Sequence, residues 1–128
     1  MIYLMADDLT GANDAGVQLA KRGLKTTVYI EPLANKGSNS IEMLEGTDVL
    51  VIDTETRDLQ AEQGAAVIKR VIENLQLVGK QNILFYKKID STFRGNVGKE
   101  IETLLSLLKK DLCILAPSYP KHNRVMIG

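Results

Sequence analysis

Cysteine, histidine and net charge are scarce in this sequence, and each scarcity excludes a class of protein. The single cysteine, Cys113, cannot form a disulfide within the chain, which fits a reducing compartment. The single histidine, His122, has no second histidine or cysteine at metal-ligand spacing, so a zinc site is excluded. Sixteen basic residues balance sixteen acidic ones, so we expect neither nucleic acid nor a membrane surface as a partner.

Long apolar runs and glycine-rich nucleotide motifs are missing as well. No apolar run approaches about 18 residues, so no membrane-spanning helix is expected. The N-terminus lacks the pattern of a secretory signal, which predicts a cytoplasmic protein. There is no Walker-type or dinucleotide-binding loop and no Ser-His-Asp set. With 45% apolar residues, the chain is predicted to be one globular domain, residues 1–128, that binds a small molecule.

Short apolar runs alternate with segments of helical periodicity along the chain. The runs are rich in β-branched and aromatic residues and predict strands at 2–5, 26–30, 49–53, 83–86 and 112–116, the last with Cys113 in the core. Apolar residues three and four positions apart predict helices at 12–22, 59–75 and 97–109, and the polar segment 32–46 predicts a loop. Apolar strands joined by helices predict an α/β fold, a doubly wound parallel sheet with helices on both faces in three layers (αβα).

Ligands of such sheets bind beyond the carboxyl ends of the strands, so the loops that follow the strands are the candidate sites. The loop after the first strand carries Asp7 and Asp8, followed by Thr10 and Gly11 at the start of a helix. Asp8 or Thr10 could be a helix N-cap. Alternatively, the two carboxylates could bind magnesium or the hydroxyl groups of a substrate, and these roles are compatible with capping.

The loop after the third strand carries Arg57. Its planar guanidinium could bind a carboxylate or a phosphate. The alternative is a local ion pair with Glu55 or Asp58. The sequence leaves both interpretations open.

The densest group of polar residues follows the fourth strand. Residues 87–98 combine two lysines, an arginine, an aspartate and two hydroxyl groups, and they lead into a helix whose free backbone N–H groups attract anions. Lys87 and Lys88 should point in opposite directions in an extended chain, so one of them is expected to reach the site. In the loop after the fifth strand, His122 is predicted to be a surface residue.

Four blocks of the sequence resemble the four-carbon acid sugar kinase family. They are Ala6-Asp7-Asp8-Leu9-Thr10-Gly11-Ala12, residues 16–20, residues 51–57, and Tyr86-Lys87-Lys88-Ile89-Asp90-Ser91-Thr92-Phe93-Arg94-Gly95-Asn96. The lysine-rich last block is similar to the D-threonate and D-erythronate kinase branch. A further block departs from the family, because Asn123 stands where a glycine is usual and two hydroxyl residues after Arg124 are missing. The resemblance covers the front part of the family's substrate-binding domain, and the C-terminal ATP-binding domain is absent.

The resemblance implies transfer of the γ-phosphoryl group of ATP to the terminal hydroxyl of a four-carbon sugar acid. ATP and Mg would be bound mainly by the absent domain, and this chain alone would be inactive. The implied substrate-binding residues are Asp7, Asp8, Thr10, Arg57, Lys88, Asp90, Ser91, Arg94 and Gly95. Of these, Arg57, Lys88 and Arg94 would hold the substrate carboxylate or neutralise phosphate charge. Asp7, Asp8, Asp90 and Ser91 would hold hydroxyl groups, and the general base stays unassigned.

Two alternatives remain open at this point. A phospho-receiver signalling domain has a similar length, and Asp7, Asp8 and Asp53 fit its acidic site. It does not account for the block from Asp90 to Asn96, however, and Lys87 stands where a receiver has a hydroxyl residue. The chain could also be a non-catalytic remnant. The oligomeric state is open, with a homo-oligomer among the alternatives.

Overall fold

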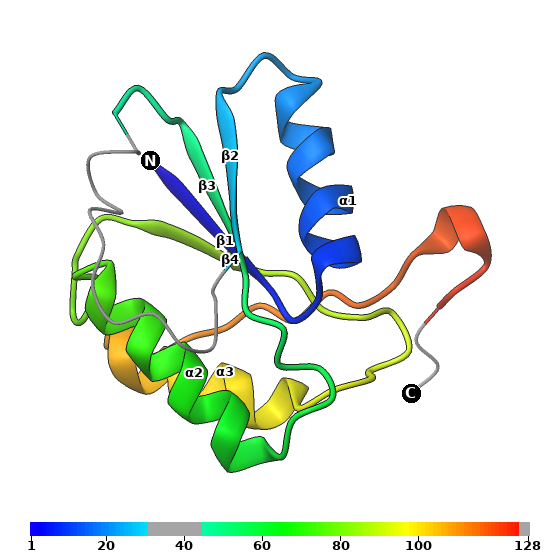
Figure 1. Cartoon of the computed structure of the whole chain (residues 1–128). Coiled ribbons are helices and arrows are strands. Elements are labelled where there is room, and N and C mark those ends of the chain that lie inside the picture. Colours follow the sequence, from blue (N-terminus) through cyan, green and yellow to red (C-terminus); the bar gives the residue numbers. More distant parts are fainter. Residues whose placement is uncertain (31–44, 126–128) are drawn as a thin grey trace.

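The computed structural model describes residues 1–30 and 45–125, which form a parallel sheet flanked by helices (Figure 1). The sheet has four strands in the order β2-β3-β1-β4, and every pairing is parallel. The elements in chain order are β1 (Ile2–Ala6), α1 (Leu9–Ala20), β2 (Thr26–Ile30), β3 (Val49–Asp53), α2 (Ala61–Asn74), β4 (Leu84–Lys87), α3 (Val97–Leu108) and the short 3-10 turn η2 (Pro120–His122).

Side chains of the central strands alternate between two separate apolar cores. Leu4 and Ala6 of β1 join Val49 and Val51 of β3 in a cluster completed by Ala12 of α1. The intervening residues of both strands face the other way and pack against α2 and α3. Figure 1 shows α1 on one side of the sheet and α2 and α3 on the other. The three-layer α/β fold predicted from the sequence is therefore confirmed.

At the carboxyl end of the sheet, the chain leaves neighbouring strands toward different faces. The chain leaves β1 toward the face covered by α1, whereas it leaves the neighbouring strands β3 and β4 toward the opposite face. Adjacent loops that diverge in this way leave room for a ligand between them. The loops after β1, β3 and β4 are therefore the ones that the fold brings together.

The predicted fifth strand is wrong. Residues 112–116 have no strand pairing in the described structure, and Leu112 and Ile114 are 76% and 86% exposed. Cys113 is exposed as well, so its predicted place in the core is also wrong. A cavity of about 540 Å³ lies between this segment, α3 and β4. Apolar composition favours a strand, but only hydrogen bonds to a neighbouring strand make one.

The other predicted strands and helices exist. The strands at 26–30 and 49–53 have the predicted bounds, and the boundaries of the remaining elements are shifted. Helix α1 begins at Leu9, earlier than predicted, because Asp8 caps it. Of the predicted loop 32–46, residues 32–44 lie outside the described residues. His122 is exposed, as predicted, and its ring lies 4.5 Å from that of Tyr119. Within the described ranges, no helix is both long and apolar enough to cross a bilayer.

Candidate functional site

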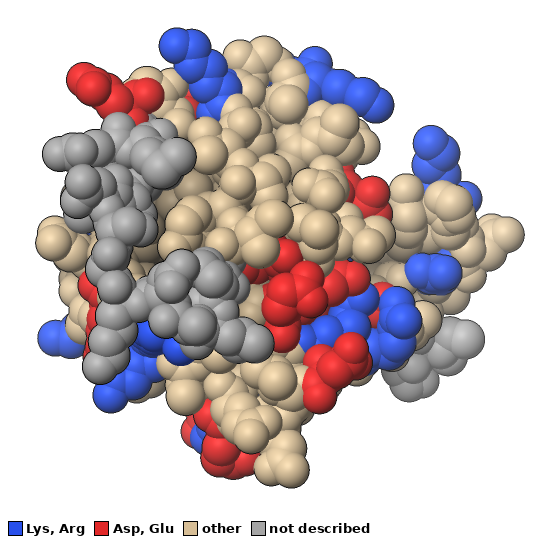
Figure 2. Space-filling view, viewed as in Figure 1, with Lys and Arg blue, Asp and Glu red and all other residues tan. Residues whose placement is uncertain are grey.

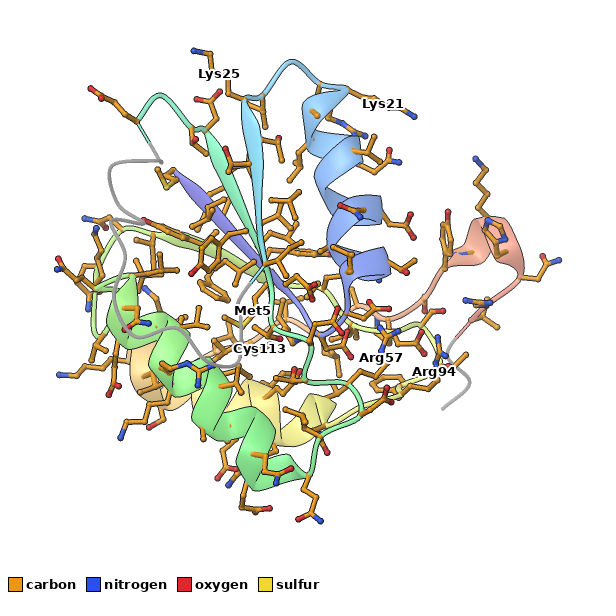
Figure 3. The ribbon with its side chains drawn as sticks, in the orientation of Figure 1. Met5, Lys21, Lys25, Arg57, Arg94 and Cys113 are labelled. Carbon is orange, nitrogen blue, oxygen red and sulfur yellow. The ribbon has the colours of Figure 1, made fainter. Side chains whose placement is uncertain are left out.

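Acidic and basic side chains gather at the end of the sheet where α1 begins. Figure 2 shows red and blue side chains side by side on this part of the drawn face. In Figure 3, Arg57 and Arg94 lie at this end, whereas Lys21 and Lys25 lie at the opposite end. The site is built from the loops after β1, β3 and β4.

Arg57 holds both carboxylates of the first loop. Its Nε and Nη2 donate to the two carboxylate oxygens of Asp7 at 3.1 and 2.9 Å, and its Nη1 donates to Asp8 Oδ2 at 2.5 Å. The Asp7 side chain is 2% exposed and that of Arg57 is 17% exposed, so Arg57 and Asp7 form a largely desolvated, bidentate ion pair. The hydrogen bond to Asp7 raises the pKa of Arg57 above its ordinary value.

Asp8 also fixes the start of α1. Its Oδ1 accepts a hydrogen bond from the backbone N–H of Gly11 at 2.9 Å, which makes it the N-cap of the helix. Its Oδ2 binds Arg57. Capping and site formation therefore coexist in one carboxylate, and the prediction that Asp8 could cap the helix is confirmed. The other candidate cap, Thr10, lies exposed in the first turn of α1.

The structure excludes one of the two interpretations left open for Arg57, a local ion pair with Glu55 or Asp58. The partners of Arg57 come from the loop after β1, which is distant in sequence and adjacent in the sheet. Glu55 instead accepts a hydrogen bond from the backbone N–H of Leu9 at 3.2 Å. The Arg57 guanidinium is thus already paired with two carboxylates, so it is not a free cation for the carboxylate or phosphate of a ligand.

The two lysines of β4 and its loop point to opposite sides, as predicted. Lys87 turns inward, where its Nζ lies 2.8 Å from Glu100 Oε2 of α3. Lys88 turns toward α1, where its Cγ lies 3.6 Å from the point that a Cβ on Gly11 would occupy. The Nζ of Lys88 donates to the backbone carbonyl of Ile89 at 2.8 Å. Lys88 is therefore the lysine that lies on the site.

Asp90 organises the tight turn after β4. Its Oδ2 accepts hydrogen bonds from the backbone N–H and the hydroxyl of Thr92, and its Oδ1 lies 2.8 Å from Arg94 Nη2. The Arg94 guanidinium, with the help of Thr92, holds the pKa of the Asp90 carboxyl well below its usual range. Arg94 itself is 66% exposed, so its remaining N–H groups face solvent.

Gly95 brings this turn against the first loop. It adopts a φ of +84°, in the left-handed region that favours glycine, and a Cβ there would lie 2.9 Å from Asp7 Oδ2. The same Cβ would lie 3.6 Å from the Cα of Arg57. The absence of a side chain is thus what lets the loops after β1, β3 and β4 meet.

Arg124 joins the site from the far end of the described chain. A bridge between Tyr119 and Arg124 closes a small loop around η2. Arg124 Nη1 then donates to the hydroxyl of Ser91. Arg124 was singled out in the sequence only as a residue shared with the family, and its position four residues after a proline gives no sign of this contact.

Asp53 was considered in the sequence only for the receiver alternative. It ends β3 beside Ala6, is fully buried, and its Oδ1 accepts a hydrogen bond from the backbone N–H of Glu55 at 3.2 Å. Burial raises its pKa to about 6, with smaller contributions from Glu55 and Asp8. A fully buried carboxylate has no room to accept a phosphoryl group, which argues against a receiver.

Three buried polar residues underneath the site were not predicted: Thr54, Thr56 and Glu100. One signal in the sequence could have found Glu100. It lies between Val97 and Leu104 on the buried stripe of α3, where an apolar residue is expected. A charged residue on such a stripe implies a buried partner.

The assembled groups are suited to a small ligand that carries a negative charge and hydroxyl groups. Lys88, Arg94 and Arg124 supply positive charge, while Asp8, whose side chain is 22% exposed, supplies an acceptor for hydroxyl donors. In residues 1–30 and 45–125, no group of three or more His, Cys, Asp or Glu side chains is placed to hold a metal ion. Asp7 and Asp8, the two carboxylates considered for magnesium, are engaged by Arg57 in this structure.

Comparison with known proteins gives a family match and related sequences. The chain matches the family described as a sugar-binding N-terminal domain over residues 2–128. It is 37% identical to a D-threonate kinase of Salmonella typhimurium and 36% identical to a D-erythronate kinase of Heliobacterium modesticaldum, over 98% and 99% of its length. It is 32% identical to a 3-oxo-tetronate kinase of Pseudomonas savastanoi over 98% of its length.

The chain spans less than a third of these relatives, namely 28% of the first two and 29% of the third. A solved structure also resembles it, with a TM-score of 0.62 and 34% identity over 80% of this chain and 24% of that one. That structure is a domain of unknown function from Bordetella bronchiseptica, crystallised as a domain-swapped dimer with bound citrate. By its sequence match and its fold, this chain belongs to the sugar-binding N-terminal domain family and corresponds to part of the four-carbon acid sugar kinases.

Proposed function

We propose that this chain binds a four-carbon sugar acid of the threonate or erythronate type. The observation that carries the proposal is the convergence of three loops, which places carboxylates and cationic side chains together at the carboxyl end of the sheet. A sugar acid needs both kinds of group, because it has one carboxylate and several hydroxyl donors. The names of the related kinases support this substrate class.

The contacts within the site suggest a division of labour. Arg57 is engaged by Asp7 and Asp8, so its role is to hold their oxygens in place and to balance their charge. Lys88 and Arg94 then bind the sugar carboxylate, and Arg124 holds the hydroxyl of Ser91. Asp8, Asp90, Ser91 and Thr10 form hydrogen bonds with the hydroxyl groups, whereas Asp7, which is 2% exposed, acts by holding Arg57. The left-handed turn at Gly95 keeps these partners close together.

We further propose that the bound sugar acid receives a phosphoryl group from ATP. Phosphoryl transfer depends mainly on positioning and charge neutralisation, and cationic groups such as Lys88 and Arg94 suit that task. ATP and magnesium would be held by a part of the enzyme that this chain does not match, since the chain spans under a third of the related kinases. The relative crystallised with citrate as a domain-swapped dimer is consistent with a site for hydroxy acids and with self-association.

Calorimetric titration of the chain with D-threonate, D-erythronate and L-threonate tests the proposal. We expect at least one of them to bind, and Lys88→Ala to weaken that binding by about tenfold or more, because an ionic hydrogen bond is lost. Lys21→Ala is the matched control, since it removes the same charge from the opposite end of the sheet (Figure 3). Absence of binding to all three acids at millimolar concentration would contradict the proposal, as would equal effects of the two substitutions.

A further inference from the structure

A continuous line of buried polar groups runs beneath the candidate site. We call Thr54, Thr56, Glu100 and Lys87 the polar bridge. Lys87 Nζ lies 2.8 Å from Glu100 Oε2, and Thr56 Oγ1 donates to Glu100 Oε1 at 2.5 Å. The hydroxyl oxygens of Thr56 and Thr54 are 2.9 Å apart, and that of Thr54 also lies 2.9 Å from the carbonyl oxygen of Ala6. The single hydroxyl hydrogen of Thr54 can be donated to one of these two oxygens.

The polar bridge is almost completely shielded from water. Thr54, Thr56 and Glu100 are fully buried, and the Lys87 side chain is 9% exposed. Lys87 Nζ and Glu100 Oε2 are close, yet neither has a well-aligned hydrogen-bond partner among the described residues. A buried ion pair is a poor source of stability, because apolar residues of similar size do as well or better. Folding alone therefore gives a weak reason for these residue types.

Two members of the polar bridge, and the residue that Thr54 contacts, directly precede residues of the site in the sequence. Ala6 precedes Asp7, Thr56 precedes Arg57, and Lys87 precedes Lys88. Glu100 lies in the first turn of α3, directly after the turn that contains Gly95. The bridge thus ties together the three loops and the helix that carry the site.

We infer that Thr54, Thr56, Glu100 and Lys87 are positioning residues. They set the orientation of Arg57 toward Asp7 and Asp8, and that of Lys88 toward α1, without touching a ligand. The inference about ligand affinity rests on the proposed function. The inference about the geometry of Arg57 does not, because the pairing of its Nε with Asp7 exists in the protein alone.

Thr56 offers the sharpest test, because valine has nearly the same shape and serine keeps the hydroxyl. Two quantities are measured: the rate of solvent exchange of the Arg57 Nε–H by NMR, and the dissociation constants of D-threonate and D-erythronate. We expect Thr56→Val to raise the exchange rate and the dissociation constant by about tenfold each. In Thr56→Ser, the exchange rate and the dissociation constants are expected to stay within about threefold of their values in the unmodified protein. Unchanged values in Thr56→Val would overturn the inference, and so would an equal loss in Thr56→Ser.

The ion pair is tested by removing both charges together. A single substitution of Glu100 leaves a buried, unpaired lysine and could unfold the protein. The double variant Lys87→Met with Glu100→Leu avoids this problem, and we expect a melting temperature close to that of the unmodified protein. The solvent exchange rate of the Arg57 Nε–H should nevertheless rise, as it is expected to do in Thr56→Val. If the double variant is stable and its Arg57 Nε–H exchanges at the same rate as in the unmodified protein, the ion pair does not position the site.

The two proposals can fail separately. If the unmodified protein binds neither sugar acid, the proposed function is wrong, but the exchange of Arg57 Nε–H still decides whether the polar bridge positions the site. If it binds a sugar acid and Thr56→Val changes neither measurement, the proposed function stands and the positioning role falls.

Discussion

Asp53 is a carboxylate whose surroundings oppose its charge. It is fully buried, and burial raises its pKa to about 6. Because the folded-state pKa lies above the unfolded value, the folded protein binds this proton more tightly. The resulting stabilisation is complete below the unfolded pKa of about 3.9 and is lost as the pH rises through about 6. Above that pH, the folded protein contains an ionised buried carboxylate.

This raised pKa predicts how Asp53→Asn changes the pH dependence of stability. Between pH 4.5 and 7.5, the unmodified protein should lose roughly 2 to 3 kcal/mol of unfolding free energy relative to the variant. Urea unfolding at several pH values measures the difference. Asp14→Asn is the matched control, since Asp14 is exposed on α1. Parallel pH profiles for Asp53→Asn and the unmodified protein would contradict the raised pKa.

Gly95 is required by its backbone conformation and by its neighbour Asp7. In Gly95→Ala, the residue would be strained at a φ of +84°, and its Cβ would lie 2.9 Å from Asp7 Oδ2. We expect a loss of about 1 to 3 kcal/mol in unfolding free energy, measured by urea titration, together with weaker sugar-acid binding. Gly98→Ala is the control. Its Cβ would meet nothing within 4 Å, and alanine favours the helix, so stability should be unchanged or slightly higher.

At the scale of elements, the sheet ends at β4 with an open edge. Leu84 and Tyr86 of β4 are 63% and 54% exposed, and the apolar residues 112–116 lie nearby without pairing. Helix α1 packs mainly on β1, β2 and β3. The apolar face of β4 on that side is therefore left uncovered by the described elements. The apolar composition of residues 112–116 predicts a strand. Strand formation also requires hydrogen bonds to a neighbouring strand, which composition does not reveal.

The exposure of residues 112–116 predicts a reactive thiol. Cys113 should react with an aromatic disulfide reagent in the folded protein within about tenfold of its rate in urea, because an exposed thiol needs no unfolding to react. A rate lower by several orders of magnitude would mean that this segment is buried in solution. As a second measure, Leu112→Asp should change stability by less than about 0.5 kcal/mol. The buried residue Leu104 of α3 is the contrast, since Leu104→Ala should cost about 2 to 5 kcal/mol.

At the scale of the whole molecule, the proposed reaction requires more chain than is present here. The chain spans 28% of the related D-threonate kinase of Salmonella typhimurium. We therefore expect no phosphorylation of sugar acids by this chain alone. We do expect turnover when it replaces the matching segment of that kinase. Coupled detection of ADP formation, with D-threonate or D-erythronate as the acceptor, measures the activity of the chimera.

Within the chimera, Arg94→Ala should lower kcat/KM by about ten- to a hundredfold, because a charged contact to the substrate is removed. Arg22→Ala is the matched control at the far end of α1, where Arg22 Nη1 donates to the carbonyl of Gln18. A chimera that turns over equally well with either substitution would exclude Arg94 from the site.

The sequence by itself determined the layers of the fold and the location of the site. Apolar runs alternating with helical periodicity specify a parallel α/β sheet, and polar residues directly after β1, β3 and β4 mark its carboxyl end. The opposite directions of Lys87 and Lys88 follow from the period of an extended chain. These features depend on local backbone geometry, which neighbouring residues in the sequence encode.

Only the tertiary structure decided which charged groups meet. Arg57 binds Asp7 and Asp8, and not the nearby Glu55 or Asp58, because parallel pairing of β1 with β3 brings two distant loops together. The polar bridge arises in the same way, from packing of α3 against the ends of β3 and β4. Burial is likewise a property of the folded molecule, which is why Asp53 has a raised pKa and Cys113 is exposed. Long-range pairing and burial are set by how the elements pack, and local sequence does not contain that information.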